Sequence, residues 1–139
     1  MENILIIEDD PYLRNVCAKN LRSPDRIVRT AKNGKDGLRE LRKEEPDLLL
    51  LDLLMPSVDG FSILEFIKEN EYSFPVIVLS NITWNFDMMG CRSIGATDYF
   101  IKSSISIPAL QQKVEERLRQ RREERISADP SGGLMRMTV

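Results

Sequence analysis

Two apolar runs in this chain each end in acidic residues. The first run, residues 4–7, is followed at once by Glu8 and Asp9. The second run, residues 48–51, consists of four leucines and ends at Asp52. An unpaired carboxylate is costly to bury in an apolar core, so we expect these acids at the edge of a sheet. Clustered carboxylates without histidine suit Mg²⁺ or Mn²⁺, and the sequence therefore predicts a divalent-metal site.

The acids after each run could instead cap the helices that follow them, because Asp is a favoured N-cap residue. This alternative stays open for Asp10, which stands directly before Pro11. It is weak for Asp52, because residues 55–57 (Met-Pro-Ser) separate that acid from the next helical pattern.

Apolar runs and amphipathic helical patterns alternate five times along the chain. The apolar runs lie at residues 3–7, 26–30, 48–51, 75–79 and 98–101, and the helical patterns at 11–21, 34–43, 58–69, 84–94 and from 108 onward. This alternation predicts an α/β protein with a parallel sheet and helices on both faces. The expected architecture is a flavodoxin-like (βα)5 three-layer sandwich with strand order 2-1-3-4-5.

This strand order predicts which side chains meet. The first and third strands are neighbours, so Glu8, Asp9 and Asp52 come together at the carboxyl edge of the sheet. The fourth and fifth strands end in Ser80 and Lys102, which reach the same edge. Three acids, a hydroxyl and a lysine are therefore expected in one site.

The composition limits the classes of function. The chain has 139 residues and a net charge of −2, which argues against a general nucleic-acid binder. No apolar stretch is long enough to span a bilayer and no signal peptide is recognisable, so a cytoplasmic protein is expected. Two cysteines make neither a disulfide framework nor a metal site. The absence of histidine excludes a role as a histidine phosphodonor.

The last helical pattern changes character near its end. Residues 115–125 carry nine charges in eleven positions, and the apolar face is lost after Leu118. One interpretation is a solvated helix end held by local ion pairs, such as Glu115 with Arg119. The other is an extension that pairs with a partner or leads into an output domain. We predict a domain over residues 1–121, followed by a charged helix end and a disordered tail over residues 122–139.

Taken together, these residues resemble the receiver domain of bacterial two-component response regulators, over about residues 2–120. Five motifs carry the resemblance, in order and at the expected spacing. They are Glu8-Asp9, Asp52 with Met55-Pro56, Asp59-Gly60, Ser80, and the stretch from Gly95 to Lys102. Each motif is weak alone, whereas the ordered set is highly specific.

The resemblance implies that Asp52 is the phosphoacceptor for a sensor histidine kinase or a histidine phosphotransfer protein. It implies Mg²⁺ or Mn²⁺ bound by Asp9, by Asp52 and by the backbone carbonyl of Leu54. Glu8 is expected to act on the metal through water. Lys102 is expected to pair with Asp52 before the reaction and with a phosphate oxygen afterwards.

The resemblance also implies a switch in a protein-interaction surface. Ser80 would donate its hydroxyl to the new phosphoryl group, and Tyr99 would rotate in response. The expected partners are a downstream protein target or a lost output domain, and a homodimer through the fourth and fifth helices. Direct contact with nucleic acid or membrane is not expected. Nor is enzyme activity, beyond self-phosphorylation from a phosphodonor and slow autodephosphorylation.

Two residues depart from the family pattern. Asn81 stands where a small residue is usual, and Ser103 stands where proline is usual, often after a cis bond. A cis bond before serine costs about 2.5–4 kcal/mol, so a trans Lys102–Ser103 bond is expected. These departures keep open an alternative, a receiver-like interaction module that needs no phosphate.

Trp84 lies near the expected signalling face. It is either an anchor for a partner protein or packed on its own helix.

A phosphatase of the haloacid dehalogenase type is a further alternative, because such enzymes also use a strand-end Asp, Mg²⁺, a hydroxyl and a lysine. Their mechanism needs a second acid two residues after the nucleophile. That position is Leu54, which cannot transfer a proton.

Overall fold

The computed structural model describes residues 1–81 and 90–128. Its strands are β1 (Glu2–Ile7), β2 (Arg26–Ala31), β3 (Leu48–Asp52), β4 (Val76–Ser80) and β5 (Asp98–Ile101). They form one parallel sheet in the order β2-β1-β3-β4-β5, which confirms the predicted topology. The helices are α1 (Pro11–Leu21), α2 (Gly34–Lys43), α3 (Gly60–Glu69), α5 (Ile107–Ala128) and the short 3₁₀ helix η1 (Lys102–Ser104). Most of the helix predicted at 84–94, including Trp84, lies outside the described residues.

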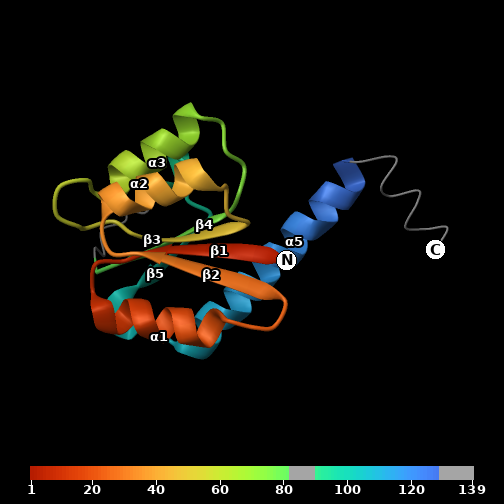
Figure 1. Ribbon diagram of the computed structural model, residues 1–139, viewed down its shortest axis with the longest axis horizontal. Coiled ribbons are helices and arrows are strands. Elements are labelled where there is room, and N and C mark those ends of the chain that lie inside the picture. Colours follow the sequence, from red (N-terminus) through yellow and green to blue (C-terminus); the bar gives the residue numbers. More distant parts are fainter. Residues whose placement is uncertain (82–89, 129–139) are drawn as a thin grey trace.

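Helices cover both faces of the sheet, as predicted. In Figure 1, α2 and α3 lie on one face, whereas α1 and α5 lie on the other. Leu49 and Leu51 of β3 belong to the apolar cluster on the α2–α3 side, and Leu48 and Leu50 belong to the cluster on the α1–α5 side. Because both faces of this central strand are buried, its sequence is apolar without interruption up to Asp52.

Acidic N-caps fix where two of the helices begin. The Asp10 carboxylate accepts hydrogen bonds from the backbone N–H groups of Tyr12 (2.9 Å) and Leu13 (3.4 Å), so this acid caps α1. Asp59 caps α3 in the same way, accepting the N–H of Ser62 at 2.9 Å. The prediction that this helix begins at residue 58 was therefore wrong by two residues, because the cap at Asp59 sets its start.

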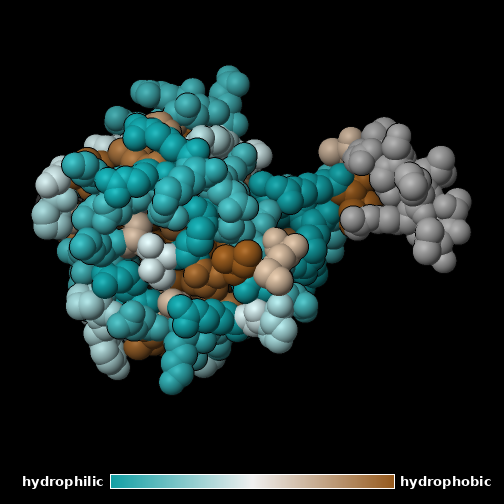
Figure 2. All heavy atoms as spheres, viewed as in Figure 1, coloured by the Kyte–Doolittle hydropathy of each residue, from teal (hydrophilic) through white to brown (hydrophobic). Residues whose placement is uncertain are grey.

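The surface is mainly hydrophilic on the face that Figure 2 shows. An apolar area lies over the edge strand β2, where Ile27 is 46% exposed. β2 is thus a partly exposed edge strand. Within residues 1–81 and 90–128, no helix combines the length and the apolar character that crossing a membrane requires.

The last helix, α5, buries Leu110, Val114 and Leu118, and its apolar face ends there as predicted. The helix continues to Ala128 and extends beyond the rest of the domain (Figure 1). It therefore runs through residue 121 without a break, and the domain boundary expected there stays a prediction. Of the predicted disordered tail, residues 129–139 lie outside the described part of the chain.

Ion pairs join the charged part of α5 to the sheet. Asp47 contacts Arg121 (Nε–Oδ1 3.6 Å) and Arg125 (Nη1–Oδ1 3.1 Å). Glu115 pairs with Arg26 of β2 at 2.7 Å. The predicted Glu115–Arg119 pair was wrong, because the better partner for Glu115 lies on the neighbouring strand rather than on its own helix.

Candidate functional site

The carboxyl ends of β1 and β3 bring three acids together. The two strands pair with Ile7 opposite Leu51, so the residues that follow, Glu8 and Asp52, are adjacent. Both acids are buried, with exposed fractions of 0% and 1%, whereas Asp9 is the least buried of the three. Each of the three carboxylates offers an oxygen, and these oxygens lie within 4.8 Å of one another.

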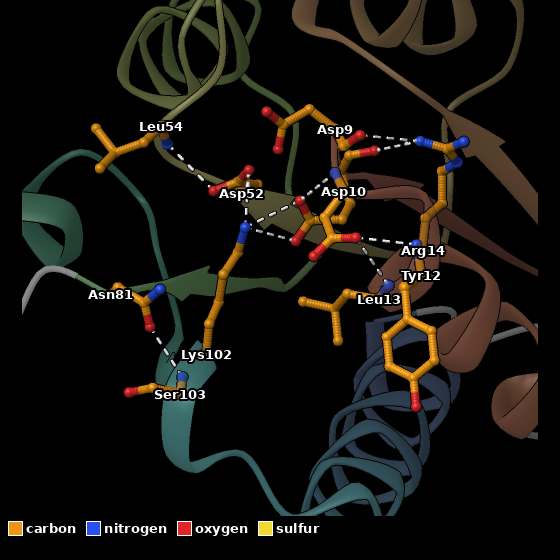
Figure 3. A network of polar contacts seen from close by, with 11 residues as sticks. Asp9, Asp10, Tyr12, Leu13, Arg14, Asp52, Leu54, Asn81, Lys102 and Ser103 are labelled. Carbon is orange, nitrogen blue, oxygen red and sulfur yellow. Dashed lines mark hydrogen bonds and ion pairs between the residues drawn. The ribbon is translucent and has the colours of Figure 1, made fainter.

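Lys102 crosses from the end of β5 to two of these acids. Its Nζ lies 2.8 Å from Oε1 and 2.9 Å from Oε2 of Glu8, and 3.0 Å from Oδ2 of Asp52. Figure 3 shows the lysine stem extended toward Asp52, and its ammonium group contacts both carboxylates. The buried acids are therefore paired, but with a single cation.

The crowding of like charges shifts the proton affinities in this site. Burial raises the pKa of Asp52 to about 8, hydrogen bonding with Asp9 and Glu8 adds to the rise, and Lys102 acts against it. Burial also acts to raise the pKa of Asp9, but hydrogen bonding with Asp52 and Glu8 and the charge of Lys102 outweigh it and hold that pKa below its usual value. Burial acts to lower the pKa of Lys102, yet contact with Glu8 and Asp52 raises it. Lys102 therefore keeps its charge, and the Asp52 carboxyl holds a proton more tightly than an ordinary aspartate does.

The donor set fits a hard divalent cation. Glu8 Oε1 and Asp52 Oδ2 are buried and accept no hydrogen bond from any described residue, although each lies within ion-pair distance of Lys102. Buried polar atoms normally have hydrogen-bond partners, and each exception needs an explanation. Three carboxylates against one lysine leave an excess of negative charge, which a cation with oxygen ligands would neutralise.

The loop after β3 is folded tightly around Asp52. The Leu54 N–H donates to Asp52 Oδ1 at 3.1 Å, and the Gly60 N–H donates to the carbonyl of Leu53 at 2.8 Å. A side chain at residue 60 would meet the backbone, because a Cβ there would lie 2.5 Å from the carbonyl oxygen of Asp52. Ser57 has a positive φ of 68°. The glycine thus permits the close return of the chain that fixes Asp52.

Arg14 is a structural contributor that the sequence reasoning missed. From the first turns of α1 its Nη1 donates to the backbone carbonyls of Glu8 (2.9 Å) and Asp9 (3.4 Å). The Asp10 N–H also donates to Glu8 Oε2 at 3.1 Å. An arginine one turn after an acidic stretch is a weak sequence signal for such a contact, because long surface arginines are common.

Asp10 itself caps α1, which answers the question left open for that acid.

The remaining predicted residues lie on β4 and β5. Ser80 is buried at the end of β4, opposite Ile101 of β5. Tyr99 is half-buried and packs against the apolar cluster on the α2–α3 side of the sheet. Asn81 follows Ser80, and its Oδ1 accepts the backbone N–H of Ser103 at 2.8 Å. No cis peptide bond occurs among the described residues, which confirms the trans bond expected before Ser103.

Comparisons with known proteins agree with this geometry. A family model described as the response regulator receiver domain matches residues 4–115. The transcriptional regulatory protein AfsQ1 of Streptomyces coelicolor is 34% identical over 131 residues, which cover 93% of this chain and 56% of that protein. The alkaline phosphatase synthesis transcriptional regulatory protein PhoP of Bacillus subtilis is 29% identical over 101 residues, which cover 73% of this chain and 42% of that protein. The chain thus spans about half the length of these curated relatives.

Solved structures show the same fold. The signal receiver domain of a DNA binding response regulator from Colwellia psychrerythraea is 28% identical and superposes with a TM-score of 0.77. The alignment covers 84% of this chain and 97% of that one.

Proposed function

Because the chain belongs to the response regulator receiver domain family of two-component systems, we propose that Asp52 accepts a phosphoryl group from a phosphohistidine. The donor would be a sensor histidine kinase or a histidine phosphotransfer protein. One observation carries the proposal: a buried strand-end carboxylate, Asp52, lies 3.0 Å from the ammonium group of Lys102 and beside two further acids.

The proposed step is a phosphoryl transfer between two protein side chains. A carboxylate oxygen of Asp52 forms a bond to phosphorus, while the bond from phosphorus to the donor's imidazole nitrogen breaks. The imidazole leaves with the bonding pair of electrons. Lys102, released from Asp52, pairs with an oxygen of the new phosphoryl group. A flexible lysine stem can follow this small displacement of charge.

Mg²⁺ or Mn²⁺ would neutralise the repulsion between the incoming phosphoryl oxygens and the acids. Asp9 and Asp52 would bind the metal directly, together with the backbone carbonyl of Leu54. Glu8 would act through water. Support for this division comes from the Glu8 carboxylate, both of whose oxygens lie within 2.9 Å of Lys102 Nζ. Asp9, the least buried acid, is the most accessible to an ion.

The switch would begin at Ser80 and pass to Tyr99. The Ser80 hydroxyl would donate to the phosphoryl group, a contact that exists only in the phosphorylated state and can therefore shift a two-state equilibrium. Tyr99 lies on β5, three residues before Lys102. Its rotation would alter the face formed by the helix predicted at residues 84–94, by β5 and by α5. A downstream target, an attached output domain or a second copy of the chain would bind there. Full-length relatives are named as transcriptional regulators, which supports an output domain.

A second candidate is a receiver-like interaction module that acts without phosphate. The departures from the family pattern at Asn81 and Ser103 favour it, because both residues flank the proposed phosphorylation site. The four charged residues of the site, Glu8, Asp9, Asp52 and Lys102, favour phosphorylation instead.

Intact-mass measurement with acetyl phosphate or phosphoramidate tests the proposal. We expect a gain of one phosphoryl group that requires Mg²⁺ and is absent in Asp52→Asn. A folded wild-type chain that gains no phosphoryl group from small donors should be tried with phosphorylated histidine kinases. No transfer from either kind of donor would reject the proposal and leave the interaction module.

A further inference from the structure

Asn81 and Ser103 follow two residues of the proposed site, Ser80 and Lys102, directly in the sequence. Both are departures from the receiver pattern, and the structure joins them: Asn81 Oδ1 accepts the Ser103 N–H at 2.8 Å (Figure 3). Proline has no backbone N–H, so this bond is possible only because position 103 holds a residue other than proline. The two departures are therefore physically coupled.

We infer that Asn81 is a positioning residue for Lys102. Its side-chain carbonyl holds the backbone just after Lys102, in place of the restraint that proline would supply. The inference rests on the proposed function, because its consequence is the placement of the lysine for phosphoryl transfer.

The hydrogen bond extends the pairing of β4 and β5 past the end of the ladder. The last paired residues are Ser80 and Ile101. Lys102 then opens η1, a short helix whose own segment supplies no side-chain cap. The first N–H groups of a helix lack internal partners, and that of Ser103 is one of them. Asn81, the residue directly after β4, satisfies it. The backbone that carries Lys102 is therefore restrained by the β4–β5 pairing at Ile101 and by this hydrogen bond at Ser103.

Fixing the backbone at Lys102 fixes the base of a long, flexible stem. The ammonium group must contact Glu8 and Asp52 at 2.8–3.0 Å in the resting state and reach a phosphoryl oxygen after the reaction. A misplacement of about 1 Å in such a group slows chemistry markedly. Ser103 is exposed, so water would satisfy its N–H if Asn81 were removed. Without Asn81 we therefore expect the protein to fold, but with the Lys102 side chain held less firmly in position.

Four variants of the full chain test this. Asn81→Ala removes the acceptor, Ser103→Pro removes the donor, the double variant removes both, and Ser103→Ala is the matched control that keeps the donor. The phosphorylation rate with acetyl phosphate at saturating Mg²⁺ is measured by intact mass, and the Mg²⁺ affinity by calorimetry. For Asn81→Ala we expect a rate about three- to tenfold lower, in line with the loss of one hydrogen bond. The Mg²⁺ affinity should stay within about twofold, because the metal ligands are untouched.

The controls separate positioning from a general structural effect. Ser103→Ala should behave as wild type, and adding Asn81→Ala to Ser103→Pro should slow the reaction no further, because the bond is already absent. An unchanged rate in Asn81→Ala would overturn the inference while leaving the proposed function intact. So would a loss that persists in full on the Ser103→Pro background, since the amide would then act directly. A wild-type chain that gains no phosphoryl group from any donor would instead reject the proposed function, and this inference with it.

Discussion

Arg117 of α5 and Asp98 at the start of β5 form a bidentate ion pair, with Nε–Oδ2 and Nη2–Oδ1 distances of 2.7 and 3.0 Å. The pair joins the last helix to the strand that leads to Lys102. Arg117→Ala would leave Asp98, whose side chain is 12% exposed, with the more distant Lys113 at 3.8 Å. We expect the free energy of unfolding to fall by about 1–2 kcal/mol, measured by urea denaturation.

Arg117→Lys is the control for this pair, because lysine keeps the charge but cannot make two parallel hydrogen bonds. Its loss of stability should be about half that of Arg117→Ala. Equal stability of all three proteins would show that the pair contributes nothing beyond solvated charges.

Removing the charge of Asp52 should stabilise the metal-free protein. The pKa of Asp52 is raised from 3.8 to about 8 in the folded state, first by burial, so the folded protein binds this proton more tightly than the unfolded chain does. Between about pH 4 and 8 the wild type therefore loses stability as pH rises, relative to a variant without the group. In a chelator, Asp52→Asn should exceed wild type by about 1–3 kcal/mol near pH 8.

Urea denaturation at pH 5, 7 and 8.5 measures this difference, which should widen with pH and level off above about pH 8. Asp25→Asn, an exposed turn residue, is the control and should track the wild type. A difference that shrinks as pH rises would have the wrong sign and would contradict the raised pKa of Asp52 in the folded protein.

Mg²⁺ should stabilise the folded chain through Asp9. A ligand at tenfold its Kd adds about 1.4 kcal/mol to the free energy of unfolding, and chelation should reverse the gain. Asp9→Asn should lose most of this effect in a thermal melt. Asp10→Asn is the matched control: the same chemical change one residue further on affects a helix cap, and Asn caps as well as Asp. If both variants lost the effect equally, the metal would not be bound as proposed.

Gly60→Ala should disturb the loop that fixes Asp52. A Cβ at this position would lie 2.5 Å from the Asp52 carbonyl oxygen and 2.5 Å from the Leu53 Cα, both in the backbone. We expect a loss of about 1–3 kcal/mol in stability together with weaker Mg²⁺ binding. Gly90→Ala, where a Cβ meets no atom of residues 1–81 or 90–128 within 4 Å, should change neither quantity appreciably. Equal behaviour of the two variants in Mg²⁺ titrations would contradict the role of the loop.

Much of this architecture could be predicted from the sequence, because buried parallel strands have a strong apolar signature. The run of four leucines before Asp52 predicted the central strand, and strand order then placed Glu8 beside Asp52. Polar contacts between a side chain and another segment left no comparable pattern in the sequence. Arg14 holds the backbone of the acidic stretch, and Glu115 pairs with Arg26 on another element.

The Asn81–Ser103 hydrogen bond shows a different limit of sequence reasoning. Each residue could be recognised as a departure from the family pattern, and the trans bond before Ser103 followed from the energy of the peptide bond. That the two departures contact each other depends on the register of β4 and β5, which apolar patterns do not define to the residue.

The ion pairs along α5 have a geometric consequence. Asp47 pairs with Arg121 and Arg125, and Glu2 pairs with Arg122, so these contacts favour one orientation of the helix about its own axis where it leaves the sheet. A helix advances 1.5 Å and turns by about 100° with each residue. The same contacts would favour one rotational orientation for any helical segment that continues α5 past Ala128. Inserting one residue there would rotate such a continuation by about 100°, whereas inserting seven would nearly restore its phase.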